Sequence, residues 1–181
     1  MELNNKTFEN AKRTITSLIE DYDIKYPLDI FELCKKMEFE VIPYSTFGNH
    51  IELLKKNSFD GFSNYFEDKK TWSIFYNENV KPKERRKFTI AHEIGHILLQ
   101  TQDEGLANFF AGYLLAPAVL IIEYKMSSVE EVMEYFKVGY QCAQSSLNRA
   151  KSRILHKAPY SDYEKAIIKS QYYFCGNDHK D

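Results

Sequence analysis

Apolar side chains recur every three or four residues along much of this chain, which is the period of an α-helix. Residues 7–22 carry the first such stripe, at Phe8, Ala11, Ile15, Leu18, Ile19 and Tyr22. Capping and stop signals accompany the same period further along, and predict helices at 30–37, 83–100, 106–115, 127–137, 140–155 and 161–176. The pattern therefore predicts a mostly helical protein.

Three shorter runs carry the β-branched and aromatic residues that are typical of strands. They are residues 39–44, Gly61–Phe66 and Thr71–Tyr76, and the turn-like sequence EDKK between the last two predicts an antiparallel hairpin. We expect a small antiparallel sheet of about three strands, packed on the helices in an α+β fold. Residues 45–58 show no clear pattern.

The composition is typical of a globular chain rather than a disordered one, since 44% of the 181 residues are hydrophobic and 28% are charged. A formal net charge of -2 gives no global attraction to nucleic acid or to an anionic membrane. The apolar stretch 109–122 is too short to span a membrane and is broken by Gly112 and Pro117, so it is interpreted as buried core. Three scattered cysteines and the lack of a secretion signal at the N-terminus favour a reducing, cytoplasmic location.

The helix expected at 83–100 is apolar almost all round, but its polar side chains share one face. They are Thr89, His92, Glu93, His96 and Gln100. Charged groups are seldom buried unless they are paired or bind a metal. A buried helix that directs its polar groups to one place is therefore a candidate site.

His92, Glu93 and His96 form an HExxH motif, in which histidines four residues apart can converge on one Zn²⁺. Glu93 lies one step round the helix, where it can act as a general base toward a water molecule on the metal. The alternative interpretation makes both histidines ordinary core residues that bond to carbonyl groups.

A catalytic zinc normally has three protein ligands and one open position. The sequence offers four candidates for the third ligand: Asp103, Glu104, Glu123 and His156. Glu104 is favoured because a short connection after Gln100 returns the chain beside His96. Asn108, one turn later, could then hold the ring of His92. Alternatively, Glu104 is only the partner of Thr101 in a helix capping box.

Two central motifs carry a family resemblance, R-x-K-F-T-I-A-H-E-I-G-H at 85–96 and E-x-x-A-N-x-F-A-x-x-L-L-x-P at 104–117. Looser similarity lies at 27–34 and 136–149. Together these stretches resemble the ImmA/IrrE family of metallo-endopeptidases. The resemblance implies a gluzincin-like zinc core with His92, His96 and Glu104 as ligands and Glu93 as base.

The resemblance also implies a partner, because several members of that family cleave a helix-turn-helix transcriptional repressor encoded beside them on a phage or integrative element. We accordingly expect a peptidase domain at 1–124 and a helical segment at 125–181. The helix pair at 127–155 is similar to a helix-turn-helix, but its second helix has no arginine in its first turns, so DNA is not an expected partner. A membrane partner is not expected either.

Several weaker candidates accompany these. The basic run 81–87 is interpreted mainly as a solvated helix start, with Arg85 as a possible substrate contact. Ile74–Tyr76 could form a strand edge that pairs with an extended substrate, which makes Ile74 and Tyr76 candidate contacts. His50 and the tyrosines could stabilise the oxyanion, and Cys175 with His179 is interpreted as a loose tail rather than a second metal site.

The sequence therefore predicts a zinc endopeptidase with one Zn²⁺ per chain that cleaves a specific regulator. The competing hypothesis is a non-proteolytic binding module whose zinc is structural and which contacts a repressor or DNA. A site closed by four protein ligands would favour the module, and an open position beside Glu93 would favour the enzyme.

Overall fold

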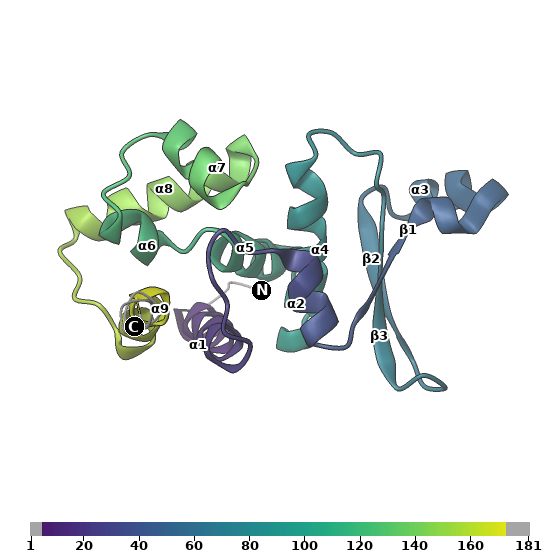
Figure 1. Ribbon diagram of the computed structural model, residues 1–181, viewed down its shortest axis with the longest axis horizontal. Helices are drawn as coiled ribbons and strands as arrows, with labels where there is room; N and C mark the ends of the chain where they lie inside the picture. Colours follow the sequence, from purple (N-terminus) through teal and green to yellow (C-terminus); the bar gives the residue numbers. More distant parts are fainter. Residues whose placement is uncertain (1–4, 173–181) are drawn as a thin grey trace, which may run out of the picture. The chain divides into compact units, whose positions relative to one another are not determined.

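The computed structural model describes residues 5–172 and has an α+β fold (Figure 1). Its N-terminal half contains α1 (Asn5–Asp21), α2 (Ile30–Lys36), β1 (Glu40–Pro43), the 3-10 helix η1 (Tyr44–His50), α3 (Ile51–Asn57), β2 (Gly61–Phe66) and β3 (Thr71–Tyr76). Six helices follow: α4 (Glu84–Leu99), α5 (Glu104–Leu115), α6 (Ala118–Glu123), α7 (Val129–Phe136), α8 (Tyr140–Leu155) and α9 (Asp162–Tyr172).

Contacts divide the chain into two units, one formed by the described parts of Met1–Leu28 and Gly112–Asp181, the other by Asp29–Ala111. The first contains α1 and α6–α9, and the second contains the sheet and α4. These units are defined by contacts within the structure and do not test a division by function. The expected division into a peptidase domain at 1–124 and a helical segment at 125–181 therefore stays a prediction.

The sheet has three strands in the order β1-β3-β2. β2 and β3 form the predicted antiparallel hairpin, with Gly61 opposite Tyr76 and Phe66 opposite Thr71. β1 pairs with β3 in parallel, so the sheet is mixed and the fully antiparallel sheet expected from the sequence is wrong. η1 and α3 form a long connection after β1, which lets β3 enter between the other two strands. A strand pattern identifies the element but not its partner, and for that reason the sequence did not reveal this pairing.

The prediction that Ile74–Tyr76 provides a free strand edge is also wrong. These residues belong to β3, the central strand, which is hydrogen-bonded on both sides. Ile74 is fully buried, and the ring of Tyr76 contacts Phe31 edge-on with centroids 5.9 Å apart. The strand with only one partner beside α4 is β2.

The two faces of the sheet have different partners. On one face, Phe62 of β2 stacks on Phe75 of β3 with ring centroids 4.7 Å apart, and Tyr44 and Phe47 of η1 pack against this pair. On the other face, α4 packs against β2 and β3. Because side chains alternate along a strand, Gly61 and Ser63 point to the α4 face while Phe62 points away from it.

α4 approaches its neighbours closely because glycines lie at the contacts. A Cβ atom on Gly95 would lie 3.0–3.2 Å from the ring and Cβ of Phe110 in α5. A Cβ atom on Gly61 would lie 2.6 Å from both the carbonyl oxygen of Phe75 and the Cγ2 of Thr89 in α4. A side chain at position 61 would therefore force Thr89 or the strand backbone to shift, whereas one at position 95 would require Phe110 to give way by a few tenths of an ångström.

Serine and glutamate side chains lie at the starts of two helices that the sequence pattern predicted in the helical unit. Ser128 accepts a hydrogen bond from the backbone N–H of Glu131 in a complete capping box at the start of α7. At the start of α9, the Glu164 carboxylate accepts a hydrogen bond of 2.9 Å from the backbone N–H of Ser161, which is one half of a capping box. Arg153 of α8 lies 2.6 Å from the same buried carboxylate. The predicted end of the last helix at residue 176, like Cys175 and His179, lies outside the described residues.

Glu104–Glu123 is the one segment in the described range that is long and apolar enough to cross a membrane, with mean hydropathy 1.9. However, 78% of its most apolar 18-residue window is buried inside the structure. It consists of two helices, because α6 begins directly after Pro117, where the sequence pattern had predicted only a stop.

Candidate metal centre

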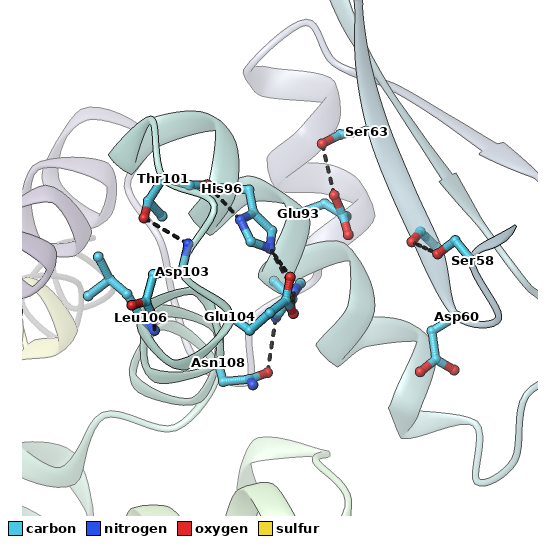
Figure 2. A network of polar contacts seen from close by, with 12 residues as sticks. Ser58, Asp60, Ser63, Glu93, His96, Thr101, Asp103, Glu104, Leu106 and Asn108 are labelled. Carbon is cyan, nitrogen blue, oxygen red and sulfur yellow. Dashed lines mark hydrogen bonds and ion pairs between the residues drawn. The ribbon is translucent and has the colours of Figure 1, made fainter. Parts of the chain in front are cut away.

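The centre is built where α4 ends and α5 begins. Gln100 adopts a left-handed backbone conformation, with φ 48° and ψ 48°, and terminates α4. Asp103 then caps α5 by accepting a hydrogen bond from the N–H of Leu106 at 2.9 Å, while its own N–H donates to Thr101 Oγ1 at 3.0 Å (Figure 2). This turn sets α5 antiparallel to α4, since the contacts pair residue 96 with 104 and residue 92 with 108.

Three side chains converge at this turn. The Nε2 atoms of His92 and His96 lie 2.9 Å apart. The Glu104 carboxylate lies 3.2 Å from Nε2 of His92 and 3.4 Å from Nε2 of His96, as Figure 2 shows for the second contact. The histidine side chains are only 14% and 13% exposed, whereas Glu104 is 74% exposed, so the centre opens toward solvent on the side of the carboxylate.

The other ring nitrogens determine which tautomer each histidine has. Nδ1 of His96 lies 2.8 Å from the carbonyl oxygen of Thr101, and Nδ1 of His92 lies 3.0 Å from Oδ1 of Asn108. Both partners are acceptors, so a neutral imidazole must carry its proton on Nδ1 and present a lone pair at Nε2. Two such lone pairs and a carboxylate directed at one point repel one another unless a cation lies between them. The donor set therefore fits a metal ion.

Of the four candidates for a third ligand, the geometry singles out Glu104. Within the described residues, the group of His, Cys, Asp and Glu atoms able to share one ion is His92, His96 and Glu104, whose ligand atoms lie within 4.8 Å of one another. Asp103 uses its carboxylate as the helix cap, which also excludes the Thr101–Glu104 capping box. Glu123 and His156 belong to the other contact unit, where they bond to Tyr172 and to the carbonyl of Ser152.

Glu93 is directed toward β2 rather than into this group. It is 8% exposed, and its Oε2 accepts a hydrogen bond of 2.8 Å from Ser63 Oγ (Figure 2). Sequence reasoning missed Ser63. The signal was present, because Gly61 and Ser63 are small residues on one face of a strand whose other face carries Phe62 and Phe66.

Arg85 has a partner within the fold. Its guanidinium lies 2.6 Å from the Asp60 carboxylate, and the two side chains are 48% and 36% exposed. Arg85 lies in the first turn of α4, where a positive charge is unfavourable because of the helix dipole. The negative charge of Asp60 offsets this effect. A substrate contact by Arg85 stays a prediction, as does the role of His50 or of a tyrosine in stabilising the oxyanion.

Thiol chemistry finds no support in this unit. Cys34 is fully buried in α2, and burial raises the pKa of its thiol to about 12. Because a nucleophilic cysteine needs a thiolate near neutral pH, Cys34 is a core residue.

A known protein family matches the part of the chain that contains this centre. The model of the family Peptidase_M78, described as the IrrE N-terminal-like domain, matches residues 45–148. The match includes the hairpin, α4, α5 and most of α8. No curated protein matches the sequence.

Proposed function

Since the chain belongs to the Peptidase_M78 (IrrE N-terminal-like) family, a family of metallopeptidases, we propose that it is a zinc-dependent endopeptidase. His92, His96 and Glu104 hold the metal in this proposal. The observation that carries it is the convergence of the Nε2 atoms of His92 and His96 with the Glu104 carboxylate, close to a buried glutamate. Two imidazoles and a carboxylate are a ligand set of catalytic zinc sites.

Zinc bound there would lower the pKa of its water to about 7 and polarise the carbonyl of the scissile peptide. Glu93 accepts the proton of the attacking water and passes it to the nitrogen of the leaving amine. Asn108 and the Thr101 carbonyl keep both imidazoles in the orientation and tautomer that the ligand role needs.

The competing function, a binding module with a structural zinc, requires a site closed by protein ligands. The three-residue group found in the described part of the chain supplies one ligand fewer than the four of a structural zinc site. The exposed carboxylate of Glu104 leaves access from solvent. Both features favour the enzyme.

The substrate, in this proposal, is one regulatory protein of the same cell, a helix-turn-helix repressor of a phage or mobile element. Its cleaved segment binds in extended form along β2, the sheet edge that lies beside Glu93. Edge pairing uses backbone groups and so discriminates little between sequences. Specificity then comes from docking away from the metal centre, at the basic run 81–87 or at the helices α7 and α8.

Dedicated cleavage predicts a clear difference between two substrates. The zinc-loaded protein should cut the regulator encoded by the neighbouring gene at one or a few bonds, and should leave unfolded casein largely intact. Gel analysis with mass spectrometry of the fragments measures this, and the chelator-treated protein is the control. Rapid degradation of casein with an intact regulator would contradict the dedicated substrate but not the zinc chemistry.

A second prediction concerns Asn108. Replacing it by alanine removes the acceptor for Nδ1 of His92, and loss of such a supporting partner costs about 10- to 100-fold in metal affinity. Competition titration with a zinc chelator measures the change. Asn148→Ala is the matched control, because Asn148 is an exposed helical asparagine that accepts a hydrogen bond from Gln144 in α8. Equal zinc affinity in the two variants would contradict the assigned role of Asn108.

A further inference from the structure

Ser63 is the one residue of β2 whose side chain is hydrogen-bonded to Glu93 in the described structure. The serine is part of an edge strand, and the glutamate is on the helix that also carries both histidines. The bond therefore connects the substrate-binding edge of the sheet directly to the residue assigned as general base.

The local packing makes this contact a consequence of register. Gly61 lies against Thr89, and its missing Cβ allows an approach that any side chain would prevent. Ser63 lies two residues after Gly61 on the strand, and Glu93 lies four residues after Thr89 on the helix. Two strand residues span about 6.7 Å and four helical residues rise about 6 Å. The two steps nearly match, so the close contact at Gly61 places Ser63 opposite Glu93.

The contact also restrains the carboxylate. A glutamate side chain has three rotatable bonds, and the terminal one is soft, so a carboxylate without a partner samples several orientations. The Ser63 hydroxyl donates to Oε2 only, which leaves Oε1 to accept a proton. A base held in one orientation meets the geometric requirement for proton transfer without reorganisation.

We infer that Ser63 is a positioning residue, which holds the carboxylate of Glu93 in the orientation that accepts a proton from the attacking water. This inference rests on the proposed peptidase function. The Ser63 hydroxyl contacts neither the metal nor the substrate in this role, so its removal should affect turnover rather than binding.

The test compares the full zinc-loaded chain with three variants. Ser63→Ala should lower kcat about 10- to 100-fold, since a hydrogen bond to a charged group is lost, while KM and zinc content stay unchanged. Ser63→Thr keeps the hydroxyl and should restore most of kcat. Ser73→Ala is the matched control, because Ser73 of β3 donates to the Glu40 carboxylate at 2.7 Å, a second serine–glutamate bond of the same sheet.

Kinetics use a quenched fluorescent peptide that spans the cleavage site in the regulator. An unchanged kcat in Ser63→Ala would overturn the inference. So would an equal loss in Ser73→Ala, or a threonine variant as slow as the alanine variant. Loss of zinc from Ser63→Ala would also overturn it, since the serine would then support the metal site as a whole.

Crystal structures of the zinc-loaded wild type and of Ser63→Ala provide a readout that needs no activity. Glu93 should have one rotamer in the wild type and more than one in the variant. The same single rotamer in both would overturn the inference. If the wild type cleaves nothing, the peptidase proposal fails, whereas the rotamers of Glu93 still decide whether Ser63 positions it.

Discussion

Glu93→Gln is expected to abolish most cleavage while the protein stays folded and metal-bound. Glutamine has the shape of glutamate, and its amide oxygen can still accept the hydrogen bond from the Ser63 hydroxyl. However, it cannot take up a proton from water. Loss of a positioned acid–base group typically lowers the rate about 10²- to 10⁴-fold. The measurement is kcat on the neighbouring regulator, with zinc content and melting temperature determined on the same samples.

A matched control for this variant is available on β1. Glu40 also accepts a hydrogen bond from a sheet serine, but it is on β1 and not on the helix that carries both histidines. Glu40→Gln should therefore cleave at the wild-type rate. Near-normal turnover in Glu93→Gln would refute the general-base assignment, and loss of zinc would show that Glu93 is itself a ligand.

Glu104→Ala is expected to remove the metal. The variant leaves two imidazoles, and the loss of a direct ligand should exceed the about 10- to 100-fold cost of losing a supporting partner. Because Glu104 is 74% exposed and its neighbour Asp103 provides the helix cap, the fold should persist. Metal analysis after dialysis against a weak chelator measures the effect.

Asp103→Ala separates the ligand from the cap. This variant should keep its zinc and lose about 1 kcal/mol of unfolding free energy, as expected for a missing N-cap. If Glu104→Ala kept its zinc and Asp103→Ala lost it, Asp103 would be the metal ligand and Glu104 would not.

Local signals in the sequence were sufficient to predict most elements of the fold. The hairpin was predicted residue for residue, because Gly61–Phe66 and Thr71–Tyr76 combine strong strand formers with a polar turn. The start of α7 was readable from Ser128 and Glu131, which form the capping box. Such signals depend on neighbours within four residues.

Features that depend on distant partners were not readable in the same way. The parallel pairing of β1 with β3 depends on how η1 and α3 return the chain, for which 45–58 carries no periodic signal. As a consequence, the edge was assigned to Ile74 and Tyr76 instead of β2. α6 was missed because Pro117 fits a helix start as well as a stop.

In the candidate site too, residues close together in the sequence were predictable and contacts between distant residues were not. His92, Glu93 and His96 share one helix, so their spacing alone predicted a common face. Glu104 and Asn108 required the assumption that the chain reverses at residues 101–103, which the turn at Gln100 and the cap at Asp103 now explain. Ser63 lies 30 residues from Glu93. The small residues Gly61 and Ser63 mark one face of the strand, but that pattern does not identify α4 as the element packed against it.

The convergence of His92, His96 and Glu104 has a consequence for the amount of protein in a cell. The fold brings these three side chains to one place, and an ion that binds only the folded state shifts the folding equilibrium by mass action. At a free metal concentration 100 times the dissociation constant, this linkage adds about 2.7 kcal/mol to the unfolding free energy. Metal supply would then set the population that survives cellular proteolysis as well as the activity of each molecule.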